Sequence, residues 1–355
     1  MEMHSASTTG LQIKVLKLPL AELITTLHFQ HQPELEIKNS KAGREECKKE
    51  SLFHLTYLAE AIASGSNEIF NQYLQWAAVM RKSRNIPMED LITDLDYIDF
   101  ACEQLLPAHD YRRVKSFITA GSQYLKDEKP LPLTTFSENN PLLAYAKQYQ
   151  SFLLNGNRLG AQALIDDLIS NGEAVTSIYE HIFQATQHEI GFLWQTNKIS
   201  VAHEHYCTAA TQQIIATLYT RIFTTAKKGV KMLACAVSGD LHEMGIRMIS
   251  DFFELDGWDT FYLGANMPDS DIIAAIKEQK VDLLALSVTM PFHISKAERL
   301  IRKIRSDDDL SQLKIIVGGY SFSQAKGLWK DIGADGSAQS AKEAVQMGNQ
   351  MITLQ

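Results

Sequence analysis

Cysteine is scarce in this sequence: there are four in 355 residues, and no two are spaced as Cys-x-x-Cys. This scarcity excludes a disulfide framework or a cysteine-rich structural zinc site and favours a reducing compartment. Long apolar runs are also missing, since none approaches the length that a membrane-spanning helix needs. The N-terminus has no basic-then-apolar targeting pattern. We therefore expect a cytoplasmic protein with no membrane partner.

An excess of positive charge is missing as well. The chain has 34 lysines and arginines against 42 aspartates and glutamates, which gives a formal net charge of −8. An acidic surface repels phosphate backbones, so we expect no nucleic-acid partner. The length exceeds that of one ordinary domain and predicts two or three.

The C-terminal region, residues 229–355, alternates short apolar runs with amphipathic stretches of helical period. This alternation predicts a flavodoxin- or Rossmann-like parallel sheet with strand order 2-1-3-4-5, in which ligands bind at the carboxyl ends of the strands. The expected strands are 230–237, 260–263, 281–288, 313–317 and a weak fifth one at 334–338.

The rest of the chain predicts an all-α architecture. Residues 140–226 contain long segments with one apolar face and short connections, which favours a four-helix bundle cap. Residues 50–130 form a second helical domain, and the prolines within 127–141 indicate a linker. An N-terminal extension, 1–49, precedes them, and its stretch 13–27 fits either a strand or a short helix. The fold class is therefore α/β plus all-α.

His242 is the candidate metal ligand. It follows the first expected strand and stands beside the start of a helix, where open α/β sheets bind ligands. Asp240, two residues earlier, can hold one ring nitrogen while the other faces a metal. Gly245 allows the backbone to pass close to a bulky group.

Two further polar or glycine-rich strand ends lie on the same edge of the expected sheet. The third strand ends in Ser287 and Thr289, whose hydroxyls can bond a ring nitrogen or a phosphate. The fourth ends in Gly318 and Gly319, which have no Cβ to obstruct a planar group. In the expected strand order these ends converge with His242 on one crevice, whose shape suits a metal cofactor with a long nucleotide tail.

The motifs Asp-x-His-x-x-Gly, Ser-x-Thr and Gly-Gly resemble those of the cobalamin-binding family. The resemblance covers roughly residues 140–355. It implies that His242 is the lower axial ligand of cobalt and that Asp240 orients it. It also implies cofactor contacts from the remaining motif residues, Gly245, Ser287, Thr289, Gly318 and Gly319, with Ser287 and Gly319 touching the displaced nucleotide tail.

A second motif, Trp-x9-Glu-His, occurs in the expected bundle as Trp194, Glu204 and His205. It is similar to that of the light-responsive cobalamin proteins, in which these side chains enclose the adenosyl group. The sequence departs from that subset after the tryptophan, where Gln195 replaces a histidine that can bind cobalt after photolysis. A bis-histidine product is therefore in doubt unless His203 or His205 substitutes.

The helical block before the bundle resembles the globin-like sensor regions of some cobalamin proteins. One such group, the photocobilins, adds a bilin, so biliverdin is the expected second chromophore. Arg81 and Arg84 are then candidates to pair with bilin propionates, or else form an exposed helix end. Cys47 and Cys102 are the candidate covalent anchors. The alternative is a structural or dimerising bundle whose aromatic residues only pack.

The resemblance implies an adenosylcobalamin-binding light sensor rather than an enzyme. No residue need act as an acid, base or nucleophile, because the cofactor supplies the chemistry. We expect a homo-oligomer whose assembly changes with light, together with an unidentified downstream protein partner. The alternative is a corrinoid protein that carries methyl groups for a methyltransferase system.

Overall fold

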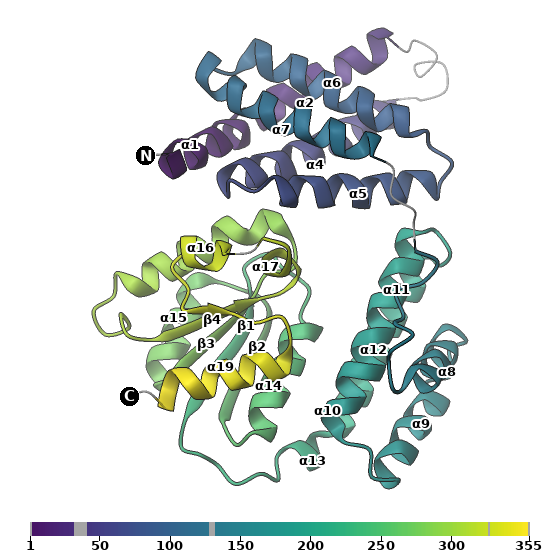
Figure 1. Cartoon of the computed structure of the whole chain (residues 1–355), viewed down its shortest axis with the longest axis vertical. Helices are drawn as coiled ribbons and strands as arrows, with labels where there is room; N and C mark the ends of the chain where they lie inside the picture. Colours follow the sequence, from purple (N-terminus) through teal and green to yellow (C-terminus); the bar gives the residue numbers. More distant parts are fainter. Residues whose placement is uncertain (1, 32–40, 128–131, 326, 354–355) are drawn as a thin grey trace. The chain divides into compact units, whose positions relative to one another are not determined.

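The computed structural model describes residues 2–31, 41–127, 132–325 and 327–353 (Figure 1). The predicted linker 127–141 lies partly outside this set, because residues 128–131 are not described. The chain divides into two compact units. Unit 1 comprises Met1–Pro130, Met290–Ser295 and Tyr320–Leu328, and unit 2 comprises Leu131–Thr289, Lys296–Gly319 and Trp329–Gln355.

Unit 1 is helical, as the residue pattern predicts. The stretch 13–27, which fitted a strand or a helix, is helical and includes the start of α2. Local breakers separate the later helices: Gly65 has a φ of +65° in one turn, and Pro87 and Pro107 stand at the N-caps of α6 and α7. The helices are α1 (Glu2–Val15), α2 (Lys17–His31), α4 (Lys41–Ala63), α5 (Asn67–Lys82), α6 (Met88–Leu105) and α7 (Ala108–Lys126).

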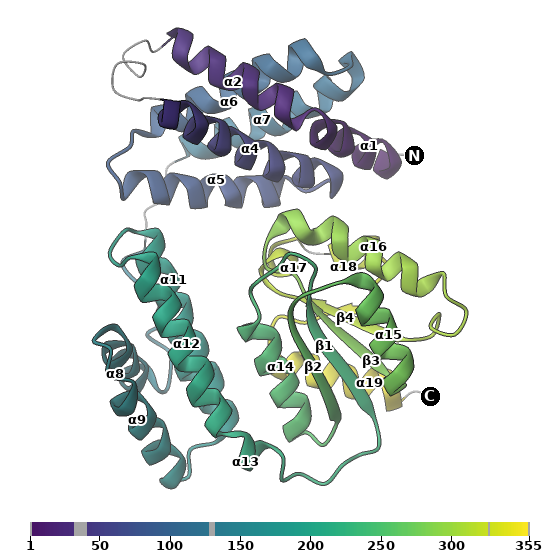
Figure 2. The ribbon, with the colours of Figure 1, turned by 180° about the vertical axis from the view of Figure 1, so that it is seen from behind.

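Unit 2 begins with a helical bundle, visible in Figure 2. Side-chain caps start two of its helices: Asn157 accepts a hydrogen bond from Gly160 N, and Ser200 accepts one from His203 N. A π-helical turn interrupts the third long segment. The elements are α8 (Leu143–Leu154), α9 (Arg158–Ser170), α10 (Val175–Ile178), η1 (Tyr179–Gln184), α11 (Ala185–Gln195), α12 (Val201–Thr217) and α13 (Tyr219–Ile222).

The second half of unit 2 is a five-stranded parallel sheet with order β2-β1-β3-β4-β5, so the predicted fold class and strand order are confirmed. Its strands are β1 (Lys231–Val237), β2 (Asp259–Met267), β3 (Leu283–Ser287), β4 (Lys314–Gly318) and β5 (Gly336–Ser337). Its helical segments are α14 (Met244–Leu255), α15 (Asp269–Gln279), α16 (Ile294–Arg305), α18 (Leu328–Asp331) and α19 (Ala341–Thr353). Two short segments from the same part of the sequence, η2 (Pro291–His293) and α17 (Tyr320–Gln324), belong to unit 1.

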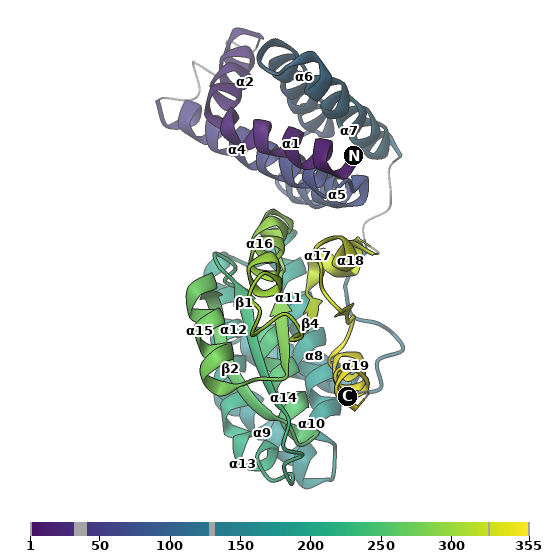
Figure 3. The same ribbon diagram turned by 90° about the vertical axis from the view of Figure 1, so that its left-hand side faces the viewer.

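Helix α14 joins the bundle to the sheet. Ile246 and Phe253 pack with the strands and with α19, while Met248 and Phe252 pack with the core of the bundle. Helices α15 and α16 cover the opposite face of the sheet (Figure 3). Because α14 is buried on both sides and starts directly after His242, it places that histidine beside the bundle.

No helix among the described residues is both long and apolar enough to span a membrane.

Candidate functional site

Asp240 fixes the orientation of His242. The Asp240 side chain is completely buried, and its Oδ1 lies 2.8 Å from His242 Nδ1 and accepts a hydrogen bond from His242 N at 3.1 Å. The imidazole itself is 58% exposed. With Nδ1 engaged, Nε2 is the ring nitrogen that remains to ligate a metal.

Asp240 also joins two strand ends that are distant in sequence. Its Oδ2 accepts a hydrogen bond of 2.6 Å from the backbone N–H of Thr289, just after β3. The structure therefore brings Thr289 to the histidine through its main chain, whereas the sequence pointed to its hydroxyl. The shared carboxylate therefore ties the loop that bears His242 to the segment that follows β3.

Ser287 and Gly318 face each other at the ends of β3 and β4, where they are paired in register. Both line a narrow groove whose remaining walls come from α14, the strands and the region before α19. This groove includes Ile246, Ala285 and Ala338. This groove is lined by Ser287 and Gly318 but not by His242, so the single crevice expected to join all three strand ends stays a prediction.

Gly319 is required for a different reason from the one predicted. Its φ is +95°, and a Cβ there would lie 2.5 Å from Val288 O. The glycine thus permits close approach of two backbone segments after β4 and β3. At Gly245, by contrast, a Cβ would meet no atom within 4 Å, which leaves open space beside the His242 loop.

One face of α12 is directed at the His242 loop. Gln212 Nε2 donates a hydrogen bond of 2.9 Å to Oε1 of Glu243, the neighbour of the histidine. Thr208 and Glu204 lie one and two turns earlier on the same face, and the Thr208 hydroxyl donates to Glu204 Oε1 at 3.1 Å. Glu204 is therefore on the side of the bundle that faces the loop.

Trp194 lies one residue before the end of α11, beside the start of α12. The two helices are tied together two turns away, where Gln187 Nε2 donates to Thr211 at 2.9 Å. Since Gln187 and Trp194 are seven residues apart, they share a face of α11. Trp194, near the end of α11, and Glu204, near the start of α12, therefore lie at the same end of this helix pair and on the same side of the bundle.

His203 and His205 stand on either side of Glu204 in the sequence. His205 is 76% exposed and pairs with Glu204 through Nδ1. His203 is also exposed, and its Nδ1 lies 2.7 Å from the hydroxyl of Ser200. Both occupy the first turn of α12, and Gln195 ends α11.

Arg81 and the two cysteines give the expected bilin site no support. Arg81 is buried and pairs with Glu50 and Asp94, so it is not available to an external propionate. Burial raises the pKa of Cys102 to about 12, which keeps the thiol protonated at neutral pH. Burial also raises the pKa of Cys47. The interpretation of Arg81 as an exposed helix end is wrong as well.

Sequence reasoning did not foresee that Gln212 and Tyr179 connect the bundle to the sheet. Gln212 donates to Glu243, which stands at an unspecified position of the Asp-x-His-x-x-Gly motif, and Tyr179 donates to Asp251. A usable clue was present for Gln212, because it lies eight residues after Glu204 and helical periodicity places both on one face.

Comparison with known proteins identifies the class of cofactor. Residues 230–346 and residues 145–219 match two family models, each described as a B12 binding domain. A dimethylamine corrinoid protein of Methanosarcina acetivorans is 26% identical over 177 residues, covering 49% of this chain and 82% of that protein. A corrinoid protein of Desulfitobacterium hafniense is 29% identical over 135 residues, covering 36% and 61% respectively.

A solved structure supports the fold. The Methanosarcina barkeri monomethylamine corrinoid protein matches with a TM-score of 0.52 at 18% identity, covering 59% of this chain and 99% of that one. Together, the B12-binding domains and the homology to corrinoid proteins support membership of the cobalamin-binding family. The more specific photoreceptor assignment finds no support among these relatives.

Proposed function

We propose that this chain holds a corrinoid between its bundle and its sheet and carries a methyl group on it for a methyltransferase system. The observation that supports this function is the extent of the similarity: a dimethylamine corrinoid protein aligns over 82% of its length with 177 residues of this chain, and both the bundle and the sheet match B12 binding domains. Bound corrinoid would supply a cobalt–carbon bond, in which the carried group resides.

In this proposal the residues of the chain hold the cofactor and do not react. His242 would hold the cobalt through Nε2, while Asp240 fixes the orientation of the ring. The nucleotide tail would run past Ser287 and Gly318, which line the small groove at the ends of β3 and β4. The site fits such a group, since the exposed imidazole has one engaged nitrogen and the space beside Gly245 is open.

An adenosylcobalamin-binding light sensor is the second candidate, and one observation favours it. Trp194 and Glu204 share the end of the α11–α12 pair, and the Glu204 face of α12 reaches the His242 loop through Gln212. An indole there provides an apolar cover, and the carboxylate can accept hydrogen bonds from ribose hydroxyls. Neither group is needed to carry a methyl group.

Competition binding in darkness distinguishes the two functions. The purified chain is loaded with methylcobalamin or adenosylcobalamin, and each is displaced by the other in the parent protein, Trp194→Ala and Glu204→Gln. A methyl carrier should bind methylcobalamin at least as tightly, and both variants should leave the ratio unchanged. A preference for adenosylcobalamin that falls by about ten-fold or more in both variants establishes the second candidate instead.

Lys198→Ala serves as the control. Lys198 lies in the turn between α11 and α12, so it tests for general disturbance of this end of the bundle. The ratio of its affinities for methylcobalamin and adenosylcobalamin should equal that of the parent under either function. Failure of all four proteins to bind either cobalamin would contradict both.

A further inference from the structure

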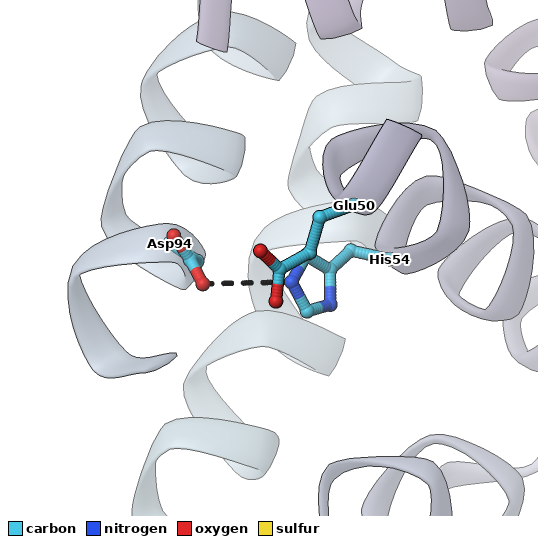
Figure 4. Close-up of side chains that lie close together, drawn as sticks. All are labelled: Glu50, His54 and Asp94. Carbon is cyan, nitrogen blue, oxygen red and sulfur yellow. Dashed lines mark ion pairs between the residues drawn. The ribbon is translucent and has the colours of Figure 1, made fainter. Parts of the chain in front are cut away.

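A buried polar cluster in unit 1 plays no part in the proposed function. It contains Glu50 and His54 from α4 and Asp94 from α6, shown in Figure 4. One ligand atom from each side chain, a ring nitrogen or a carboxylate oxygen, lies within 4.8 Å of the other two. His54 and Asp94 are buried, whereas Glu50 is half exposed and gives access from solvent.

His54 points to a ligand because one of its nitrogens is unsatisfied. Its Nδ1 lies 2.6 Å from the Tyr73 hydroxyl, which fixes the ring. Its Nε2 is buried and makes no hydrogen bond with any described residue; Asp94 Oδ2 is 3.5 Å away, beyond good hydrogen-bond distance. A buried nitrogen without a hydrogen-bond partner is unfavourable, and a metal ion would remove that cost.

The surrounding groups resemble the outer contacts of a metal site. In the tautomer whose Nδ1–H is donated to the Tyr73 hydroxyl, the lone pair of His54 Nε2 is directed toward the carboxylates. His28 Nε2 lies 2.8 Å from Asp94 Oδ1 and supports that carboxylate from the opposite side. Metal-ligating imidazoles and carboxylates are commonly held in this manner by a second ring of partners.

The charge balance leaves room for a cation. Glu50 and Asp94 carry two negative charges, and Arg81, which pairs with both, carries one positive charge. The remaining negative charge is matched either by a bound cation or by a protonated histidine.

We propose that Glu50, His54 and Asp94 bind one divalent transition-metal ion, with zinc as the fitting probe. One imidazole and two carboxylates suit zinc. Zinc holds each ligand atom about 2.0–2.1 Å from the metal. The three ligand atoms, which now lie within 4.8 Å of one another, would therefore have to come closer together. Glu50, the solvent-accessible ligand, therefore moves inward on binding, and its Oε2 is free of the contact with Arg81.

The test measures zinc per chain by mass spectrometry after equilibrium dialysis of the cobalamin-loaded protein. Loading occupies His242, and detection of zinc is unaffected by the cobalt of the corrinoid. The parent protein should bind close to one zinc at micromolar concentration. His54→Gln should weaken binding by about 100-fold or more, and Glu50→Gln by about 10-fold.

His109→Gln is the matched control, since this exposed histidine also lies beside a carboxylate, 3.1 Å from Asp110, but outside the cluster. It should bind zinc as the parent does. Absence of zinc from the parent, or equal binding by the parent and Glu50→Gln, overturns the proposal and leaves a protonated histidine as the balancing charge. Glu50→Gln decides the matter if His54→Gln does not fold, because residue 50 is half exposed.

Discussion

The Tyr179 hydroxyl donates a hydrogen bond of 2.8 Å to Asp251 Oδ2 and thereby connects the π-helical turn of the bundle to α14. Both side chains are buried. Burial raises the pKa of Asp251 to about 6, although the hydrogen bond from Tyr179 and the charge of Arg247 oppose the rise. The carboxyl group is therefore protonated more readily in the folded protein than in the unfolded chain.

This relationship predicts a pH-dependent effect of Asp251→Asn. A raised pKa means that Asp251 stabilises the fold most below about pH 4 and that this contribution is lost as pH rises to about 6. The asparagine lacks the titration and still accepts from Tyr179. Its free energy of unfolding, relative to the parent, should increase by roughly 2–3 kcal/mol between pH 4 and pH 7.

Urea denaturation at several pH values measures this difference, with Asp167→Asn on the exposed face of α9 as the control. The control should show little change across the same range. A difference between parent and Asp251→Asn that is constant with pH would contradict the raised pKa.

His242 and Asp240 should have graded effects on cobalamin retention. His242→Ala removes the proposed ligand, and Asp240→Asn keeps the shape but weakens the hydrogen bond that orients the ring. We expect about 10- to 100-fold weaker binding for Asp240→Asn and a larger loss for His242→Ala. The absorption spectrum of bound cobalamin reports the lower ligand, and an unchanged spectrum in His242→Ala would exclude His242 from that role.

Gly319→Ala should destabilise unit 2 by roughly 2–5 kcal/mol, because it adds a backbone clash to an unfavourable φ. The added Cβ would lie 2.5 Å from Val288 O. Gly172→Ala separates the two effects: Gly172 has a similar φ of +89°, but a Cβ there meets nothing within 4 Å. Thermal unfolding should show a loss of only about 1–2 kcal/mol for Gly172→Ala. Equal losses would mean that the strand ends relax around the added methyl group.

Illumination tests the light-sensor candidate directly. If Trp194 and Glu204 contact an adenosyl group, its loss removes contacts that favour one arrangement of bundle and sheet, and the other arrangement gains population. The hydrodynamic radius or oligomeric mass of the adenosylcobalamin-loaded protein should then differ between darkness and light. Protein loaded with hydroxocobalamin provides the control and should not change. A spectrum that responds to light while radius and mass stay constant would argue against the switch.

Local patterns in the sequence determined most of the secondary structure. Apolar runs and helical periods predict the five strands and the helices between them. A strand buried on both faces carries a continuous apolar run, and a helix buried on one face carries apolar residues at helical spacing. The link from Asp240 to His242 was also predictable, since the two residues are only two positions apart. The stretch 13–27 was ambiguous because its short apolar run fits a strand and a helix equally.

Only the tertiary structure decided how distant segments meet. The bond from Asp240 to Thr289 spans 49 residues, and that from Gln212 to Glu243 joins the bundle to the sheet loop. Neither bond produces a periodic pattern in the sequence, because a single hydrogen bond between two elements does not constrain the spacing of residues within either element. For the same reason the sequence does not reveal that His54 and Asp94 lie close together. Each residue fits its own helix, and the two meet only where α4 and α6 pack against each other.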